Sequence, residues 1–166
     1  MHYALMTILT KDIKKQMEKY KETEDNHYPI AKWDNFGVGR RFAKFFIRKD
    51  GVSTFAVKIS DIDFEAMKNE MKEAAEIEYS FFENMEGLSE EKFKRMVKRT
   101  LGEYLTKEEY IEKRCKEYRL PSAFLKDGEW YDAKRSGSDA QWVIDFEKMF
   151  EELPESTEVI ILDCHI

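Results

Sequence analysis

Apolar residues follow two periodicities along this chain, one typical of strands and one typical of helices. Nearly unbroken apolar runs over 3–9 and 159–162 predict two buried strands. Alternation of apolar and polar residues over 53–59 predicts a third strand. Because an Asp-Gly pair at 50–51 supplies turn chemistry, we expect 41–48 and 53–59 to form a hairpin.

Apolar residues recur at helical spacing in two parts of the chain. We expect a first amphipathic helix over 11–21, with Thr10 as its capping residue. A helical block of about 61–119 follows, and Thr106 with Glu109 forms a Thr-x-x-Glu capping box inside it. A new helix start within the block indicates that it contains several separate helices.

The remaining segments complete the expected fold class. A second hairpin is expected over 123–131 around another Asp-Gly turn, followed by a helix over 139–150. Hairpins mixed with single helices favour an α+β fold over a doubly wound parallel sheet. We expect a mainly antiparallel sheet with adjacent N- and C-terminal strands, helices on one face and the helical block inserted mid-chain. All of this is expected to form one domain of residues 1–166.

Composition indicates a folded protein. The chain has 166 residues, of which 42% are hydrophobic and 14% aromatic, too many for a disordered sequence. It has no apolar run of the roughly 18 residues that a membrane span needs, and no secretory signal segment. Two cysteines without CxxC spacing predict reduced thiols, not a disulfide framework or a zinc site. We therefore expect a cytoplasmic protein without a cofactor.

Basic residues are concentrated in the first part of an acidic chain. The net charge is −6, but residues 1–60 hold 12 Lys and Arg against 7 Asp and Glu, whereas residues 61–166 hold 16 against 27. Nucleic-acid binding normally uses a broad basic face, so we do not expect direct binding to nucleic acid. A local site for an anion fits this distribution better. Solvated helix faces are the alternative explanation of the imbalance.

The stretch from Trp33 to Phe42 combines an aromatic anchor, a carboxylate, two glycines and two arginines. Glycine permits positive φ, and neighbouring guanidinium groups suit a phosphate or carboxylate. The third glycine of a dinucleotide fingerprint is missing, which excludes a Rossmann site. The stretch therefore supplies a candidate ligand- or partner-binding set: Trp33, Asp34, Gly39, Arg40 and Arg41. In the alternative, Trp33 is a core anchor and Asp34 pairs internally with Arg40 or Arg41.

Asp163 and His165 share one face of the last strand, because side chains alternate along a strand. Cys164 lies on the opposite face, which argues against a nucleophile pair of Cys164 and His165. Asp163 can orient His165, and antiparallel pairing of the terminal strands would bring His2 beside His165. His2, Asp163 and His165 can then perform acid/base work or bind a metal. The alternative is a hydrogen-bonded pair at the end of a sheet.

Local signatures of the common catalytic classes are missing from the sequence. It contains no GKS/T loop, HExxH, GxSxG or EF-hand pattern. This favours a binding protein over an enzyme. If the chain is an enzyme, we expect Asp163 and His165 as catalytic residues, with Arg40 and Arg41 as anion ligands.

Three blocks of the sequence carry a resemblance to a known family. They are Trp33-Asp34 through Gly39-Arg40-Arg41-Phe42, the hairpin over 123–131, and 159–166, which ends in Asp-Cys-His-Ile. In this order they resemble a family of small, uncharacterised bacteriophage and prophage proteins, whose first block reads Trp-Asp-Trp-Tyr-x-Ile-Gly-Gly-Arg-Trp. Asn35 and Phe42 depart from aromatic and Trp positions of that block. Arg40 occupies its second glycine, where an arginine adds charge and disfavours positive φ.

The resemblance implies a phage accessory protein that acts in the cytoplasm of a bacterial host. Together with the missing catalytic signatures and the acidic surface, it predicts a binding protein. Such a protein is expected to counter a bacterial defence system by engaging a host protein or a nucleotide-like ligand. The alternative is a small enzyme that acts on a phosphorylated or nucleotide substrate.

Overall fold

The computed structural model describes residues 1–27, 31–85 and 87–166. The chain divides into two compact units. Unit 1 comprises Met1–Asp63 and Arg119–Ile166 and contains the sheet, whereas unit 2 comprises Phe64–Tyr118 and is helical. The fold is therefore α+β, as predicted. Among the described helices, none is long and apolar enough to cross a membrane.

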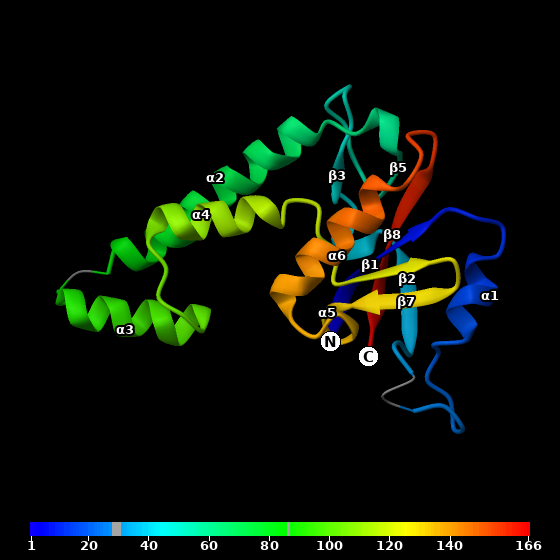
Figure 1. Cartoon of the computed structure of the whole chain (residues 1–166), viewed down its shortest axis with the longest axis horizontal. Coiled ribbons are helices and arrows are strands. Elements are labelled where there is room, and N and C mark those ends of the chain that lie inside the picture. The colour runs from blue at the N-terminus through cyan, green and yellow to red at the C-terminus, as the bar shows by residue number, and fades with distance from the viewer. Residues whose placement is uncertain (28–30, 86) are drawn as a thin grey trace. The chain divides into compact units, whose positions relative to one another are not determined.

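A six-stranded sheet forms the centre of unit 1 (Figure 1). Its strands are β1 (His2–Ile8), β2 (Asn35–Val38), β5 (Ala56–Lys58), β6 (Ala123–Lys126), β7 (Glu129–Asp132) and β8 (Glu158–His165). The order is β2-β8-β1-β6-β7, and β5 also pairs with β8. All pairs are antiparallel except β1 with β6. The predicted adjacency of the N- and C-terminal strands is confirmed.

Strand β8 has neighbours along both of its edges. One edge pairs with β1, and the other pairs with β2 and β5 in succession. At the junction, the Gly39 amide donates to the Ile161 carbonyl (3.0 Å), and the Ile161 amide donates to the Phe55 carbonyl (2.8 Å). Six consecutive residues of β8 are buried, which explains its apolar run, since a central strand is covered on both faces.

Residues 40–54 leave the sheet between β2 and β5. They form a 3-10 turn, η1 (Arg40–Phe42), and a two-stranded ribbon of β3 (Phe46–Ile47) with β4 (Ser53–Thr54). The first predicted hairpin is therefore confirmed next to its turn, whereas Ala56–Lys58 of its predicted second strand pair with β8 instead. The strand predicted over 41–48 is wrong in its first half, because the Phe42 amide turns back to the Gly39 carbonyl (2.8 Å).

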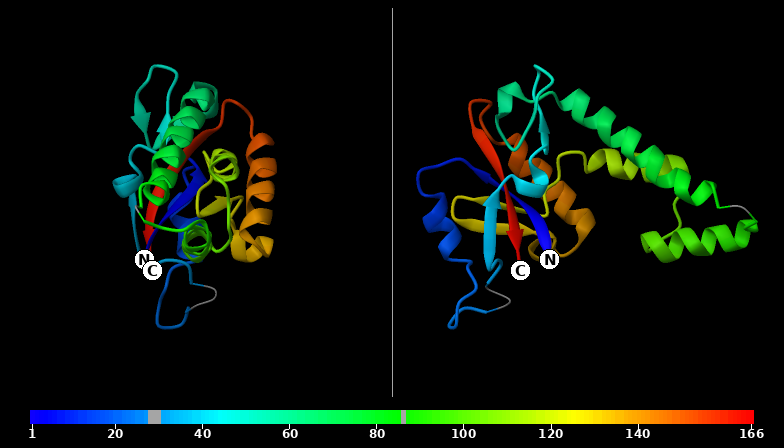
Figure 2. Two further views of the ribbon diagram at one scale, coloured as in Figure 1. Left: turned by 90° about the vertical axis from the view of Figure 1, so that its left-hand side faces the viewer. Right: turned by 180° about the vertical axis from the view of Figure 1, so that it is seen from behind.

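Helices pack against both faces of the sheet. One face is covered by α6 (Asp139–Glu151), the orange helix in Figure 2. The ring of its Phe146 packs against Phe124 of β6, with centroids 5.8 Å apart. On the other face, α1 (Ile13–Glu18) places Met17 in an apolar cluster with Leu5 and Leu125. We expected helices on one face only. The longer helix, α6, covers one face, and the short helix α1 covers the other.

Polar residues set the limits of several helices. Ser138 caps α6 by accepting a hydrogen bond from the Gln141 amide (3.1 Å). The first helix is shorter than predicted, and the residue at its N-cap position is Asp12 in place of Thr10. A short helix, α5 (Ala133–Ser136), follows β7 and is capped by Asp132.

Unit 2 matches the helical block that the sequence predicts. It contains α2 (Phe64–Glu83), α3 (Glu90–Leu101) and α4 (Lys107–Lys116). Tyr79 of α2 is buried, and its hydroxyl donates to the Leu105 carbonyl (2.8 Å). The predicted capping box of Thr106 and Glu109 is present at the start of α4.

The second predicted hairpin, β6 with β7, is also confirmed. Asp127 and Gly128 at its turn both have positive φ, 54° and 77°. Two successive positive φ values define the type I′ turn that suits the twist of a hairpin. The Asp-Gly pair therefore fixes this turn locally.

We expect Gly39→Ala to destabilise unit 1 more than Gly51→Ala. Both glycines have positive φ (65° and 81°), but only at Gly39 would a Cβ stand 2.7 Å from the Phe55 ring. This overlap should lower the free energy of unfolding of Gly39→Ala by about 1–3 kcal/mol more than that of Gly51→Ala. Urea unfolding of both variants measures this difference, and equal losses would contradict it.

Candidate functional site

The stretch from Trp33 to Phe42 contains an edge strand and a 3-10 turn. Residues Asn35–Val38 form β2 and pair with the last four residues of β8, with Phe36 opposite Cys164. Trp33 is buried, and its indole Nε1 donates to the Met17 carbonyl (3.0 Å). Trp33 therefore fits the alternative of a core anchor. It also lines a pocket of about 350 Å³ together with Asp34, so its role as a contact for a ligand or partner stays a prediction.

Gly39 and Arg40 have unusual backbone conformations. Gly39 is buried, and its amide is already bonded to the Ile161 carbonyl, so it does not offer a donor to a ligand. Arg40 adopts a positive φ of 42°, contrary to the expectation that an arginine would avoid it. Its exposed side chain lies over Gly37, where a Cβ would stand 1.9 Å from the Arg40 Nε atom. Gly37 therefore makes room for the arginine.

Two Asp–His pairs lie at the end of β8. His2 and His165 are direct cross-strand partners of β1 and β8, with ring centroids 4.9 Å apart, so their predicted proximity is confirmed. The Nδ1 atom of His2 lies 2.8 Å from Asp163 Oδ1, and Nδ1 of His165 lies 3.0 Å from Asp34 Oδ1. We call these four residues the histidine site.

The partners within the histidine site differ from two expectations. Asp163 pairs with His2 and does not orient His165, since β1 brings the His2 ring to it. Asp34 pairs with His165 in place of Arg40 or Arg41, because β2 runs beside the end of β8. The Arg41 backbone amide instead faces Asp163 Oδ2 at 3.5 Å.

The two carboxylates have different surroundings. The side chain of Asp163 is only 1% exposed, whereas that of Asp34 is 44% exposed. Burial alone would raise the pKa of Asp163, but the hydrogen bonds from His2 and the Arg41 amide hold it below its usual value. The pKa of Asp34 is also lowered, chiefly by its hydrogen bond with His165.

Neither a thiol nor a metal-ligand set belongs to the histidine site. Cys164 is buried on the opposite face, as predicted, and burial raises the pKa of its thiol to about 12. In the described part of the chain, no group of three or more His, Cys, Asp or Glu residues is placed to hold a metal ion. The site therefore offers imidazoles and carboxylates as its reactive groups.

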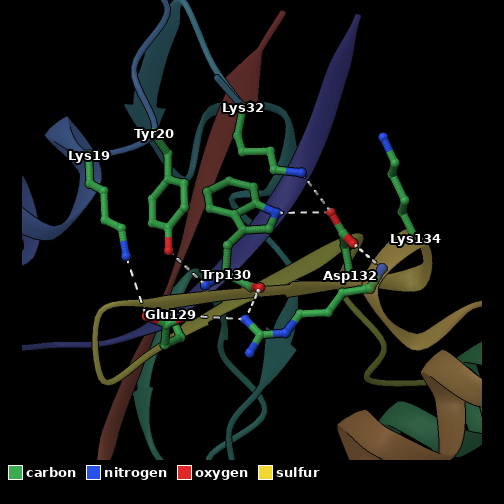
Figure 3. A pocket seen from close by; sticks show the side chains of 8 residues that line it. Lys19, Tyr20, Lys32, Glu129, Trp130, Asp132 and Lys134 are labelled. Carbon is green, nitrogen blue, oxygen red and sulfur yellow. Dashed lines mark hydrogen bonds and ion pairs between the residues drawn. The ribbon is translucent and has the colours of Figure 1, made fainter. Parts of the chain in front are cut away.

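A separate pocket of about 490 Å³ lies beside β7 (Figure 3). We call it the basic pocket, because four basic side chains outnumber two carboxylates among the described residues that line it. These residues are Lys19, Tyr20, Lys32, Glu129, Trp130, Asp132, Lys134 and Arg135. Such a volume is in the range that accommodates a small ligand.

Ion pairs and hydrogen bonds organise the basic pocket. Glu129 forms ion pairs with Lys19 and Arg135, each with a nitrogen–oxygen distance of 3.3 Å. Asp132 forms one with Lys32 at 3.5 Å. The Trp130 indole also donates to Asp132 (3.1 Å) (Figure 3). The carboxylates thus hold the cations around the Trp130 ring.

Sequence reasoning missed the basic pocket. Its residues come from the two positions directly after α1, from the segment that precedes β2, and from β7 with α5. The only local signal is the hairpin at 123–131, which predicts β7 but not which basic side chains face it. Tertiary packing of α1 against the sheet brings Lys19 and Tyr20 to β7, where the Trp130 amide donates to the Tyr20 hydroxyl (3.1 Å).

No protein-family model, curated protein or solved structure matches this chain.

We expect Asp163→Ala to lower the free energy of unfolding by about 1–3 kcal/mol near pH 7, because His2 and the Arg41 amide lose a buried acceptor. The lowered pKa in the folded state means that this stabilisation is present above the unfolded pKa, about 3.9, and is lost as the pH falls through the folded pKa. In urea unfolding, the free energies of unfolding of Asp163→Ala and wild type should therefore become more similar below about pH 4.

The exposed Asp34 supplies the matched control. Asp34→Ala is expected to destabilise the protein less than Asp163→Ala, since water replaces the lost hydrogen bond. A difference for Asp163→Ala that stays constant from pH 7 to pH 3 would contradict the assignment of a stabilising buried carboxylate.

Proposed function

We propose that this chain is a phage-type accessory binding protein that takes a small anionic, nucleotide-like ligand into the basic pocket. The observation that supports this most directly is the local charge. A chain with a net charge of −6 gathers four basic side chains against two carboxylates around one pocket. Concentrated positive charge of this kind attracts anions to a particular place on an acidic surface.

Lys19, Lys32 and Arg135 of the basic pocket keep donors for a ligand. A lysine ammonium has three donors and an arginine guanidinium has five, more than their ion pairs with Glu129 and Asp132 use. Lys19 and Arg135 are about half exposed, and pairs of this kind are weak. A phosphate group can therefore share these donors without dismantling the pocket.

The floor of the basic pocket favours a ligand that is more than a bare anion. The rings of Tyr20 and Trp130, which both line the pocket, lie with centroids 5.2 Å apart. An aromatic floor beneath a charged rim suits a ligand with one flat apolar part and one phosphorylated part. A nucleotide has both.

The biological setting follows from the resemblance and is part of the proposal. A phage protein that binds a nucleotide-like signal in the host cytoplasm can counter a defence system by withholding that signal. A host protein is the alternative partner, and exposed apolar side chains of α2 would suit such an interface. These are Ile77 and Phe81, one helical turn apart and 61% and 69% exposed.

Calorimetric titration with ATP and with pyrophosphate tests the binding proposal. We expect wild type to bind, and Lys19→Ala and Arg135→Ala to weaken binding by about tenfold each, which corresponds to about 1.4 kcal/mol. Lys44→Ala is the matched control, because Lys44 is exposed and does not line the pocket. Absence of binding by wild type, or equal weakening by Lys44→Ala, would refute the proposal.

A second candidate function is a small enzyme that acts on a phosphorylated or nucleotide substrate. The specific observation in its favour is the histidine site, where two imidazoles are each held by a carboxylate through Nδ1. A carboxylate in this position orients an imidazole for proton transfer at its other nitrogen.

Incubation with bis(p-nitrophenyl) phosphate and with nucleotides tests the enzyme candidate. We expect product release by wild type and a loss of at least about 100-fold in His165→Ala, the usual worth of a general acid or base. His165 is partly exposed, so this variant should fold. Unchanged turnover in His165→Ala would rule out a catalytic role for this residue.

A further inference from the structure

The two imidazoles of the histidine site face solvent side by side. The side chains of His2 and His165 are 31% and 42% exposed, and their rings meet edge to face at an interplanar angle of 62°. Both come from a paired register position, so the sheet holds their spacing. A substrate can therefore reach both rings at once.

Each imidazole is bonded through the same ring atom. Asp163 and Asp34 both accept at Nδ1, and within the described residues no hydrogen bond involves Nε2 of either ring. Hydrogen bonding at Nδ1 fixes the ring orientation and leaves Nε2 for proton transfer. The site thus presents two oriented Nε2 atoms, which is what simultaneous acid and base catalysis requires.

Two guanidinium groups accompany the imidazoles. Arg40 lies over Gly37, and Gly37 is the cross-strand partner of Asp163. The next residue, Arg41, sets its amide on Asp163, and its exposed side chain adds a positive charge near that carboxylate. Arginine is well suited to the oxygens of a phosphate group.

The histidine site as the structure describes it consists of imidazoles and carboxylates, without a thiol or hydroxyl among its four residues. Cys164, the thiol nearest in sequence, belongs to the opposite face and is kept protonated by burial. A reaction at this site must therefore draw its nucleophile from water or from the substrate. A substrate that carries its own hydroxyl next to the phosphorus has the advantage of proximity.

We infer that His2 and His165 are the general acid and base of a cleavage reaction on a ribose phosphodiester with a free 2′-hydroxyl. Arg40 and Arg41 bind the phosphate in this reaction. The inference rests on the second candidate function and is independent of ligand binding in the basic pocket.

The two imidazoles account for every proton that the reaction transfers. One imidazole takes the proton of the 2′-hydroxyl at Nε2 while the 2′-oxygen forms a bond to phosphorus. The bond from phosphorus to the 5′-oxygen breaks, and the other imidazole, protonated at the outset, gives its proton to that oxygen. The products are a 2′,3′-cyclic phosphate and a free 5′-hydroxyl, and solvent proton exchange restores both rings.

The same chemistry can come from long RNA or from short oligoribonucleotides. The acidic balance of the chain opposes a long polyanion, which needs a broad basic surface. We therefore expect a dinucleotide to be cleaved more efficiently than a 20-nucleotide RNA. Cleavage of the long RNA alone would overturn the preference for a short substrate.

The test is cleavage of uridylyl(3′→5′)adenosine by the full chain in the presence of a chelator, followed by chromatography and mass spectrometry. We expect a uridine 2′,3′-cyclic phosphate product and no cleavage of the 2′-deoxy analogue. His2→Ala and His165→Ala should each reduce the rate by at least about 100-fold. His27→Ala is the matched control, because His27 is exposed and pairs with Glu22 away from the site.

Variants that keep the hydrogen bonds separate catalysis from folding. His2→Asn retains an amide donor for the buried Asp163 but has no Nε2, so it should fold like wild type and lack activity. Asp34→Asn, a positioning change, should reduce the rate less than His165→Ala does and shift the pH profile of the rate. Unchanged activity in a folded His2→Asn protein would overturn the inference.

The substrates also separate this inference from the functions proposed above. Equal cleavage of the 2′-deoxy analogue would leave the enzyme candidate standing and overturn the inference, because no 2′-hydroxyl would be needed. Failure to cleave any phosphodiester or nucleotide would refute both. Titration of the basic pocket with ATP reports on the binding proposal separately in each case.

Discussion

Hydrogen bonding along both edges of β8 is the constraint on which the rest of unit 1 depends. One edge is occupied by β1 over seven residue pairs, and the other is divided between β2 and β5. The division forces the chain out of the sheet at Gly39 and back at Phe55, with Ile161 bonded at both points. The 3-10 turn that carries Arg40 and Arg41 exists because of this detour.

The same pairing assembles the histidine site. Residues from three distant segments meet at the end of β8, because the register sets His2 opposite His165 on one side and Asn35 opposite His165 on the other. Asp163 is buried between two small residues of the neighbouring strands, Ala4 and Gly37. A larger residue at either position would take the space of the carboxylate or of Arg40.

The sheet also separates the two candidate sites. The histidine site lies on the face that α6 also covers, whereas Trp130 and Tyr20 of the basic pocket belong to the apolar cluster on the face that α1 covers. Their chemistry differs as well, with oriented imidazoles on one face and concentrated cations on the other. The two proposed functions, ligand binding and catalysis, therefore use separate sites, and either proposal can fail without affecting the other.

Much of the fold was determined by the sequence alone, because its signals are local. The apolar run of β8, the Asp127-Gly128 turn and the Thr106 capping box depend on residues close together in the chain, and each was predicted correctly. Alternation along β8 also placed Asp163 and His165 apart from Cys164. Strand adjacency then brought His2 to His165.

Only the tertiary structure decided which groups pair with one another. Both carboxylates of the histidine site had several partners within reach in sequence, and the lateral order of β1, β8 and β2 selected His2 for Asp163 and His165 for Asp34. The grouping of cations in the basic pocket has no local signal, since they come from separate segments. Periodicity along a chain specifies which way a side chain points, whereas its partner depends on which strand lies alongside.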